Sequence, residues 1–179
     1  MILVISTCKE PLHEIEFVKP IEKILQKNKI ELLIKHYSKT TKGDLHKADK
    51  IIICGTSLKD NQFLDEVGKF NWLKTTSKSV LGICAGMQII GLIFKGKIKK
   101  QKEIGMIEIN FKKNFLGALG SKKVYCLHGN YVKFPKEFEV FAQSKNCAQA
   151  IKHKQKEIYG TLFHPEVRNY EMILNFCEI

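Results

Sequence analysis

The chain has 179 residues, of which 44% are hydrophobic, and a formal net charge of +12. This length suits a single globular domain, residues 1–179, and leaves no room for two large ones. The longest apolar run, 79–94, is interrupted by glycines and by Gln88, so no segment reads as a membrane span. No signal peptide is recognisable either, and we expect a cytoplasmic protein with no membrane partner.

The positive charge comes almost entirely from lysine, because Arg168 is the only arginine. Arginine supplies the bidentate contact to guanine edges, and the lysines are spread along the chain. We therefore expect a solvated basic surface and no nucleic-acid partner. The six cysteines are scattered, with no C-x-x-C pair and no clustered histidines. This pattern argues against a zinc site and a disulfide framework, and we expect neither metal nor cofactor.

Hydrophobic periodicity predicts alternating strands and helices in the first half of the chain. We expect strands at 1–6, 30–37, 50–54 and 79–84, and helices at 14–26, 63–73 and 85–94. The second half instead predicts strands with short connections, at 104–111, 122–127, 138–143, 147–152 and 157–163. A final helix is expected at 168–177. The fold class is therefore α/β, with a mostly parallel doubly wound sheet followed by strands that are partly antiparallel.

The segment "VLGICAGMQ" places Cys84 between two glycines where a strand is expected to meet a helix. One interpretation is a buried thiol in a tightly packed spot. The other is a nucleophile elbow, which needs small neighbours because its turn is strained. A thiol at a helix N-terminus also has its pKa lowered by the helix dipole, and the N–H of Ala85 would point toward a developing oxyanion.

Two further strand ends could complete such a site. "IIICGTS" ends at Gly55 and Thr56, whose backbone amides could add a second oxyanion donor, although a glycine there could also simply start a turn. "YGTLFHPEV" places His164 and Glu166 two residues apart in a segment expected to be extended, so both side chains can point to one side. A carboxylate beside an imidazole orients the ring and stabilises the imidazolium. Alone, His-Pro-Glu could be a surface turn, but with Cys84 it predicts a thiol hydrolase.

The motifs "GICAGMQ" and "GTLFHPEV" resemble those of the class I glutamine amidotransferases, a family with a Cys-His-Glu triad. His164 lies 80 residues after Cys84, a separation that fits the family. The resemblance covers essentially the whole chain and implies a flavodoxin-like three-layer sandwich. It implies that Cys84 is the nucleophile, His164 the base and Glu166 its orienting acid.

The resemblance also implies substrate-binding residues. Gln88 matches a glutamine that contacts the substrate, and "LHGN" matches a loop that grips the amino-acid end of glutamine through His128, Gly129 and Asn130. The chain departs from the family at the oxyanion strand, where Thr56 and Ser57 follow Gly55 in place of Gly-Gly-Pro. Asn130 also stands where the GMP synthetase amidotransferases usually have aspartate.

Residues 139–167 nonetheless resemble the small, separately encoded glutaminase subunits of archaeal GMP synthase. The expected reaction is hydrolysis of L-glutamine to glutamate and ammonia, with the ammonia passed to a separate ATP-dependent synthetase subunit. Two alternatives stay open: a stand-alone γ-glutamyl hydrolase with the same triad, and a non-catalytic lysine-rich binding protein. A redox or chaperone-type relative is disfavoured, because Ala85 stands where those proteins usually have histidine.

Overall fold

A single nine-stranded sheet forms the centre of the molecule in the computed structural model, which describes residues 1–179. The strand order is β2-β1-β3-β4-β9-β8-β7-β5-β6. The first five strands in this order run parallel, and the pairs from β9 to β6 are antiparallel. The strands are β1 (Ile2–Ser6), β2 (Leu32–His36), β3 (Lys50–Ile53), β4 (Ser79–Ile83), β5 (Lys97–Phe115), β6 (Ala118–Lys133), β7 (Phe138–Gln143), β8 (Ala148–His153) and β9 (Ile158–Thr161). The expected α/β class, with parallel strands first and antiparallel strands later, is confirmed.

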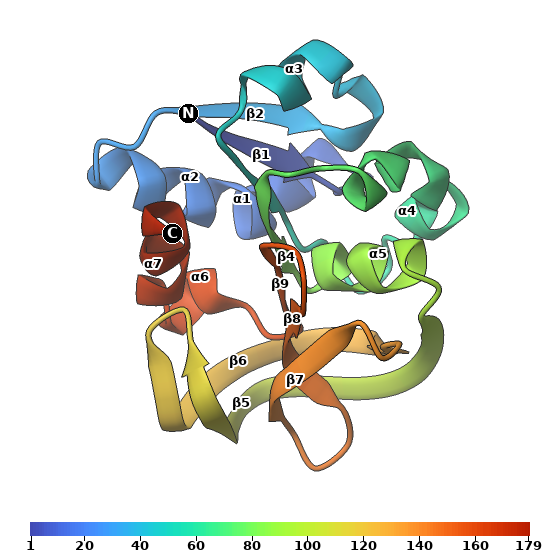
Figure 1. Ribbon diagram of the computed structural model, residues 1–179, viewed down its shortest axis with the longest axis vertical. Helices are drawn as coiled ribbons and strands as arrows, with labels where there is room; N and C mark the ends of the chain where they lie inside the picture. Colours follow the sequence, from blue (N-terminus) through green and yellow to red (C-terminus); the bar gives the residue numbers. More distant parts are fainter.

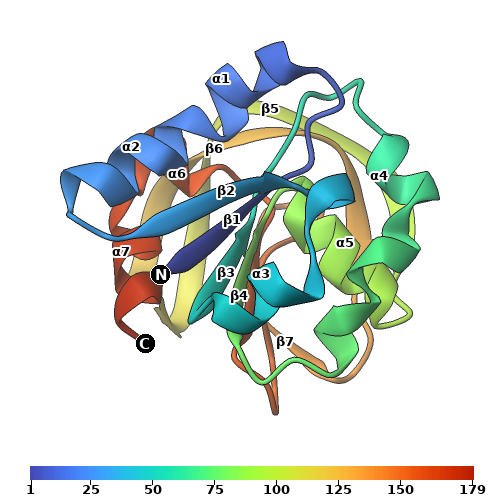
Figure 2. The ribbon, with the colours of Figure 1, turned by 90° about the horizontal axis from the view of Figure 1, so that it is seen from above.

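Helices cover both faces of the parallel part of the sheet, as Figures 1 and 2 show. One face carries α1 (Glu14–Phe17), α2 (Lys19–Lys27), α6 (Pro165–Arg168) and α7 (Glu171–Glu178). The other carries α3 (Lys42–Lys47), α4 (Gln62–Asp65) and α5 (Ala85–Ile93). Three short 3-10 helices complete the list: η1 (Pro11–His13), η2 (Tyr37–Lys39) and η3 (Val67–Lys74). None of the helices has the length and apolar character needed to cross a bilayer.

Alternating residues of the central strands supply two hydrophobic cores, one on each face of the sheet. In β1, Ile2 and Val4 belong to the core under α2 and α7, whereas Leu3 and Ile5 belong to the core under α5. All five residues of β1 are buried, as expected for a strand covered on both sides. The continuous apolar runs of the sequence arise from this double coverage.

The helix expected at 14–26 is divided in two, which corrects the sequence-based boundary. α1 ends at Phe17, and α2 begins at Lys19 with Pro20 in its first turn. Proline has no backbone N–H and starts a helix more readily than it continues one. Because of this break, Ile15 is 61% exposed, although its spacing placed it on the apolar face.

The strands expected at 104–111 and 122–127 are the middle of a much longer hairpin. β5 and β6 pair from Lys97 opposite Lys133 to Phe115 opposite Ala118 and form the long curved band at the bottom of Figure 1. The hairpin runs past the carboxyl ends of the parallel strands, so β6 contacts both α5 and α6. This brings β6 residues to the edge of the sheet where Cys84 lies.

Helix boundaries differ elsewhere as well. The helix expected at 63–73 consists of α4 followed by the 3-10 helix η3, and the final helix expected at 168–177 is α7 preceded by the short α6. The six-residue helix α3, whose Thr41 and Asp44 form a capping box, was not predicted from the sequence.

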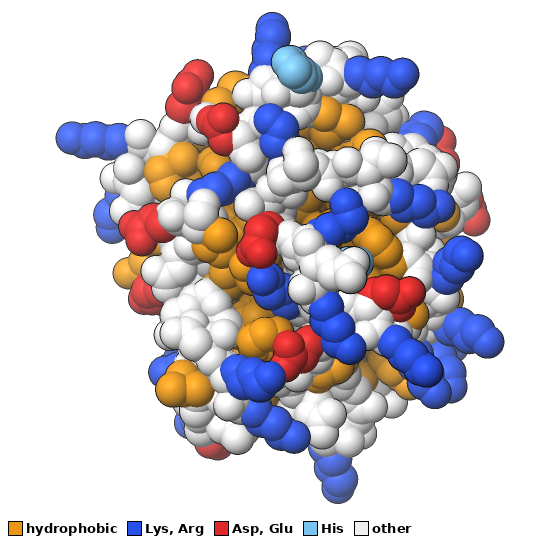
Figure 3. Space-filling view, in the orientation of Figure 1, with side chains coloured by type: hydrophobic (Ala, Val, Ile, Leu, Met, Phe, Trp, Pro, Cys, Tyr) orange, Lys and Arg blue, Asp and Glu red, His pale blue; other side chains and the backbone are white.

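Lysine side chains are scattered over the surface, as expected. In Figure 3 they extend from the whole of the visible face, with acidic side chains between them. The basic residues on this face therefore do not gather into one stripe of the kind that tracks a nucleic-acid backbone.

Candidate active site

Cys84 occupies a strained turn between β4 and α5. Its φ of 49° and ψ of −100° lie outside the regions that non-glycine residues usually adopt. The turn sets Cys84 at the N-terminus of α5, and the side chain is 4% exposed. Its Sγ lies 3.6 Å from the carbonyl oxygen of Leu127. Such strain at one residue is typical of positions that serve function.

The two glycines around Cys84 make this turn possible. A Cβ on Gly82 would lie 2.6 Å from the backbone carbon of Gly86, and a Cβ on Gly86 would lie 2.3 Å from the carbonyl oxygen of Ile53. Both contacts are with backbone, which cannot move aside without disturbing the strand. The G-x-C-x-G pattern is therefore required by close packing of α5 against β3 and β4.

His164 and Glu166 lie beside this turn and contact each other. The Nδ1–H of His164 donates a hydrogen bond of 2.7 Å to Oε1 of Glu166, and both side chains are almost fully buried. His164 is extended, but Pro165 opens α6 with Glu166 in its first turn, so the segment is not extended throughout as expected. The rings of Phe17 and Tyr125 pack near the imidazole, with centroids 5.5 and 6.5 Å away. Nε2 of His164 has no hydrogen-bond partner within the protein.

Strand register brings these distant segments together. β4 and β9 are parallel neighbours in which Ile83 lies opposite Thr161. The N–H of Cys84 continues this ladder with a 2.7 Å hydrogen bond to the carbonyl of Thr161. The chain then reaches His164 three residues later, at the same edge of the sheet.

The electrostatics of the group favour a charged imidazole. Burial acts to lower the pKa of His164, but the Glu166 carboxylate and the Cys84 sulfur outweigh it and hold the pKa well above its usual value. The direction follows from stabilisation of the imidazolium by negative charge on both sides. A charged imidazole beside a cysteine is suited to activating the sulfur as a nucleophile.

The end of β3 faces the same point. A Cβ on Gly55 would lie 2.7 Å from Cε1 of His164 and 3.3 Å from Cβ of Cys84. The hydroxyl of Thr7 donates to the carbonyl oxygen of Gly55 at 3.3 Å, from the β1 side. In a trans peptide the carbonyl and the N–H point in opposite directions, so the N–H of Thr56 is directed toward the β4 side, where Cys84 lies.

Two backbone N–H groups near the sulfur lack acceptors. Thr56 follows β3, and its N–H makes no hydrogen bond within the protein. Ala85 is the first residue of α5, and the first N–H groups of a helix have no intrahelical acceptor. The two are placed to stabilise negative charge on an oxygen bound at Cys84.

A small cavity connects these groups. Its volume is about 20 Å³, enough for roughly one water molecule. It is lined by the turn after β3, the start of α5 and part of β6: Thr56, Ser57, Leu58, Asp60, Asn61, Phe63, Cys84, Ala85, Gln88, Leu127, His128, Gly129 and Asn130. Every residue implied as substrate-binding except Gly55 lines this cavity.

Comparison with known proteins places this geometry in a family. Residues 13–176 match the family model described as glutamine amidotransferase class-I. The chain belongs to the class I glutamine amidotransferases. This confirms the resemblance carried by "GICAGMQ" and "GTLFHPEV".

Curated relatives of this amidotransferase include GMP synthase proteins. A glutamine-hydrolysing GMP synthase subunit of Methanosphaera stadtmanae is 40% identical over 111 residues, which cover 56% of this chain and 60% of the relative. The corresponding protein of Methanococcus maripaludis strain C5 is 38% identical over 110 residues, covering 55% of this chain and 58% of the relative. The matches thus span somewhat under two thirds of the length of these relatives.

Solved structures agree on the fold. A Thermoplasma acidophilum protein described as a GMP synthase subunit superposes with a TM-score of 0.86 at 25% identity, covering 99% of this chain and 92% of that one. A glutamine amidotransferase from Thermotoga maritima gives a TM-score of 0.72 at 16% identity, covering 99% and 86% of the two chains. The second likeness concerns the fold alone.

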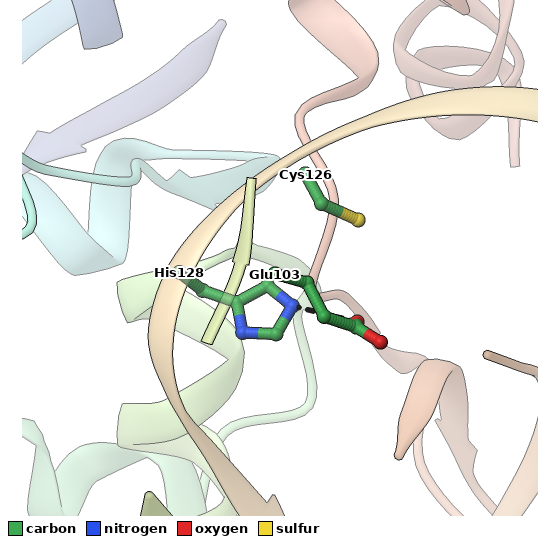
Figure 4. A group of neighbouring side chains, drawn as sticks. All are labelled: Glu103, Cys126 and His128. Atoms are coloured by element: carbon green, nitrogen blue, oxygen red, sulfur yellow. Dashed lines mark hydrogen bonds and ion pairs between the residues drawn. The ribbon is translucent and has the colours of Figure 1, made fainter. Parts of the chain in front are cut away.

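The amidotransferase contains another group of cysteine, histidine and glutamate, shown in Figure 4. Glu103 comes from β5, and Cys126 and His128 come from β6. The Cys126 sulfur, a ring nitrogen of His128 and a carboxylate oxygen of Glu103 lie within 4.8 Å of one another. The three residues thus have the composition of a Cys-His-Glu triad. The ring nitrogens of His128 lie 3.1 Å from two acceptors, the carbonyl of Gln101 and the carboxylate of Glu103, and a neutral imidazole donates to one of them.

Several observations indicate that this Glu103 group is a buried polar network. The Glu103 carboxylate also accepts hydrogen bonds from the side chains of Ser144, Asn146 and Gln149, each between 2.7 and 2.8 Å. Cys126 is fully buried within a strand, and burial raises the pKa of its thiol. Burial lowers the pKa of His128, because it disfavours the charged form of the ring as it does that of the thiol. A thiol so placed is neither ionised nor accessible at neutral pH.

The resemblance implied that His128 grips the substrate, and this role stays a prediction. Its ring nitrogens face the Gln101 carbonyl and the Glu103 carboxylate of β5. Gln88 of α5 donates through Nε2 to the carbonyl of Asn130 at 3.2 Å. This second contact holds the end of β6 against α5 and so shapes one wall of the cavity.

Two buried carboxylates near the site were not singled out from the sequence. Glu103 lies among lysines in a segment that reads as surface, and Asp60 lies in the polar stretch after β3. Both are buried in the fold, with Asp60 only 4% exposed. Their partners come from other strands and turns, so no local pattern marks them.

Proposed function

We propose that this protein hydrolyses the side-chain amide of L-glutamine to glutamate and ammonia, with Cys84, His164 and Glu166 as the catalytic triad. The observation that carries the proposal is the arrangement of these three side chains. A cysteine on a strained elbow lies beside an imidazole whose Nδ1 is bound to a buried carboxylate and whose Nε2 is free. Family membership supports the same chemistry.

The first half-reaction forms a covalent intermediate. The Cys84 thiolate attacks the amide carbon of glutamine, and the N–H groups of Thr56 and Ala85 bind the resulting oxyanion. His164 then donates its proton to the departing nitrogen, which leaves as ammonia, and a γ-glutamyl thioester remains on Cys84. Glu166 keeps the imidazole oriented and stabilises its charged form.

The second half-reaction releases glutamate. His164, now neutral, takes a proton from a water molecule that attacks the thioester carbon. The tetrahedral intermediate collapses, the carbon–sulfur bond breaks, and glutamate leaves. Both halves use the triad and the two backbone N–H groups, and water enters only in the second.

The ammonia passes to a separate ATP-dependent synthetase subunit, with a GMP synthase as the first candidate. The relatives from Methanosphaera stadtmanae and Methanococcus maripaludis are named as subunits of GMP synthase, which supports the assignment.

The test measures glutamate formation with the synthetase subunit of an archaeal GMP synthase present and absent, together with covalent labelling by 6-diazo-5-oxo-L-norleucine. We expect labelling on Cys84 and a loss of about 10³-fold or more in Cys84→Ser. Cys126→Ser is the matched control, because it changes the other cysteine that has a nearby histidine and glutamate. Labelling on Cys126, or full activity of Cys84→Ser, would overturn the proposed triad. Full activity without the synthetase subunit would instead favour a stand-alone amide hydrolase.

A further inference from the structure

Asp60 is a buried carboxylate beside the cavity that the triad mechanism does not use. It lies in the turn after β3, where its own N–H bonds to the carbonyl of Ser57, and it is 4% exposed. A buried charge is costly unless hydrogen bonds or an opposite charge compensate it. Its partners therefore indicate what it holds in place.

Three donors converge on a single oxygen of Asp60. Oδ2 accepts from the hydroxyl of Thr56 at 2.7 Å, from the N–H of Lys9 at 3.0 Å and from Nδ1 of His13 at 2.7 Å. Burial acts to raise the pKa of Asp60, but these hydrogen bonds outweigh it and lower the pKa, so the group is a carboxylate at neutral pH. Charged acceptors form roughly twice as strong a bond as neutral ones. Asp60 thus ties Thr56 to the turn after β1 and to η1.

Thr56 is held from two sides as a result. The hydroxyl of Thr7 fixes the carbonyls of Cys54 and Gly55, at 3.1 and 3.3 Å. Asp60 fixes the side chain of Thr56 at the other end of the same peptide unit. Between these two anchors lies the Thr56 N–H, which has no acceptor in the protein.

We propose that Asp60 is a positioning residue that orients the Thr56 N–H for oxyanion binding through its hydrogen bond to the Thr56 hydroxyl. The inference rests on the proposed function. In this chain threonine and serine follow Gly55, so no proline stiffens the turn. The threonine side chain supplies the restraint instead, and Asp60 is its anchor.

The central variant is Thr56→Val, which keeps the shape of the side chain and removes only the hydroxyl. We expect kcat for glutamine hydrolysis, measured with the synthetase subunit, to fall about 10- to 100-fold, somewhat less than the loss of a whole oxyanion donor. KM is expected to stay unchanged, because the restraint acts on the transition state. Alkylation of Cys84 by iodoacetamide is also expected to stay unchanged, since that displacement creates no oxyanion. Thr56→Ser keeps the hydroxyl and is expected to restore most of the kcat that Thr56→Val loses.

Asp60→Asn tests the same bond from the other side, and thermal unfolding shows whether it folds. The double variant Asp60→Asn/Thr56→Val is expected to be no slower than the slower single variant, because both changes break one interaction. Thr41→Val is the matched control: it removes a similar bond, from the Thr41 hydroxyl to Asp44 at 2.8 Å, in the cap of α3. It is expected to lower the melting temperature without changing kcat.

The inference is overturned if Thr56→Val keeps wild-type kcat, if iodoacetamide alkylation falls in parallel with kcat, or if the two single effects multiply in the double variant. Failure of the proposed function looks different, because wild-type protein would then neither hydrolyse glutamine nor be labelled at Cys84. An active wild type with an unaffected Thr56→Val removes the role of Asp60 alone.

Discussion

Replacing Gly55 by alanine tests whether the end of β3, Cys84 and His164 share one tightly packed point. The new methyl carbon would lie 2.7 Å from Cε1 of His164 and 3.3 Å from Cβ of Cys84. Ordinary contacts begin near 3.4 Å, so the imidazole and the strand end must separate by about 0.7 Å. His164 has little freedom to move away, because Glu166 holds Nδ1 at 2.7 Å and the side chain is 1% exposed.

The expected effects follow from this displacement. A misplacement approaching 1 Å in a catalytic group costs about 10²-fold in rate, and we expect a loss of that order in kcat. Overpacking of a buried site typically costs about 1–3 kcal/mol in the free energy of unfolding. For a chain of this size that corresponds to a fall of roughly 2–12 °C in melting temperature. Activity should therefore be nearly abolished while the protein still folds.

The assay compares glutamate formation, Cys84 labelling and thermal unfolding in Gly55→Ala and Gly43→Ala. Gly43 lies in α3, where an added methyl group meets only Thr41 Oγ1 at an ordinary 3.6 Å. Gly43→Ala is expected to be neutral or slightly stabilising, as alanine favours helices. Wild-type activity in Gly55→Ala would refute the packing described for the three groups. A fold too unstable to purify would show that the clash is larger than one side chain can absorb.

Two other variants address charge. Glu166→Gln removes the carboxylate that raises the pKa of His164, so the alkaline limb of the pH–rate profile should move to lower pH. We also expect kcat to fall by about 10²–10⁴-fold. An unshifted alkaline limb would contradict the role of Glu166. In Glu103→Gln the carboxylate that binds five side chains, including the Cys147 thiol, is lost, and we expect about 1–3 kcal/mol of destabilisation at pH 7 in urea unfolding. Burial acts to raise the pKa of Glu103, but the hydrogen bonds to the carboxylate outweigh it and lower the pKa. The ionised carboxylate therefore stabilises the fold above the unfolded pKa of about 4.3, and this stabilisation is lost as the pH falls through the folded pKa. The stability curves of wild type and Glu103→Gln should therefore converge in acid, and a constant gap would refute the assignment.

The parts of the fold and site that the sequence predicts are those set by local pattern. Fully buried strands such as β1 and β3 read as continuous apolar runs, and the G-x-C-x-G spacing marks the elbow because the packing constraint lies within five residues. The adjacency of His164 to Cys84 depends on β4–β9 register, which no local pattern encodes. The position of both residues after strand ends suggested it, and the family resemblance supplied the pairing.

The features that escaped prediction depend on distant partners. The β5–β6 hairpin extends beyond the core, and its lysine-rich ends are held by backbone pairing more than by apolar burial, so hydrophobic periodicity fades there. Glu103 and Asp60 are charged residues in polar stretches, and their burial follows from donors on other elements. The contact of His128 with Glu103 shows the same limit, since its partner lies on another strand and is not visible in the local sequence.

The parallel pairing of β4 with β9 leaves the chemistry insensitive to much of what lies between them in the sequence. The Cys84 N–H bonds directly to the Thr161 carbonyl, and of the intervening chain β6 adds the Tyr125 carbonyl, which accepts from the His164 N–H, and the Leu127 carbonyl beside Cys84 Sγ. The stretch from Leu127 to Asn130 borders the cavity, whereas the hairpin tip near Leu116 packs against α7 through Asn175. Phe115, Leu116 and Ala118 are buried at that tip, so insertions there should lower the stability of the fold without retuning the nucleophile.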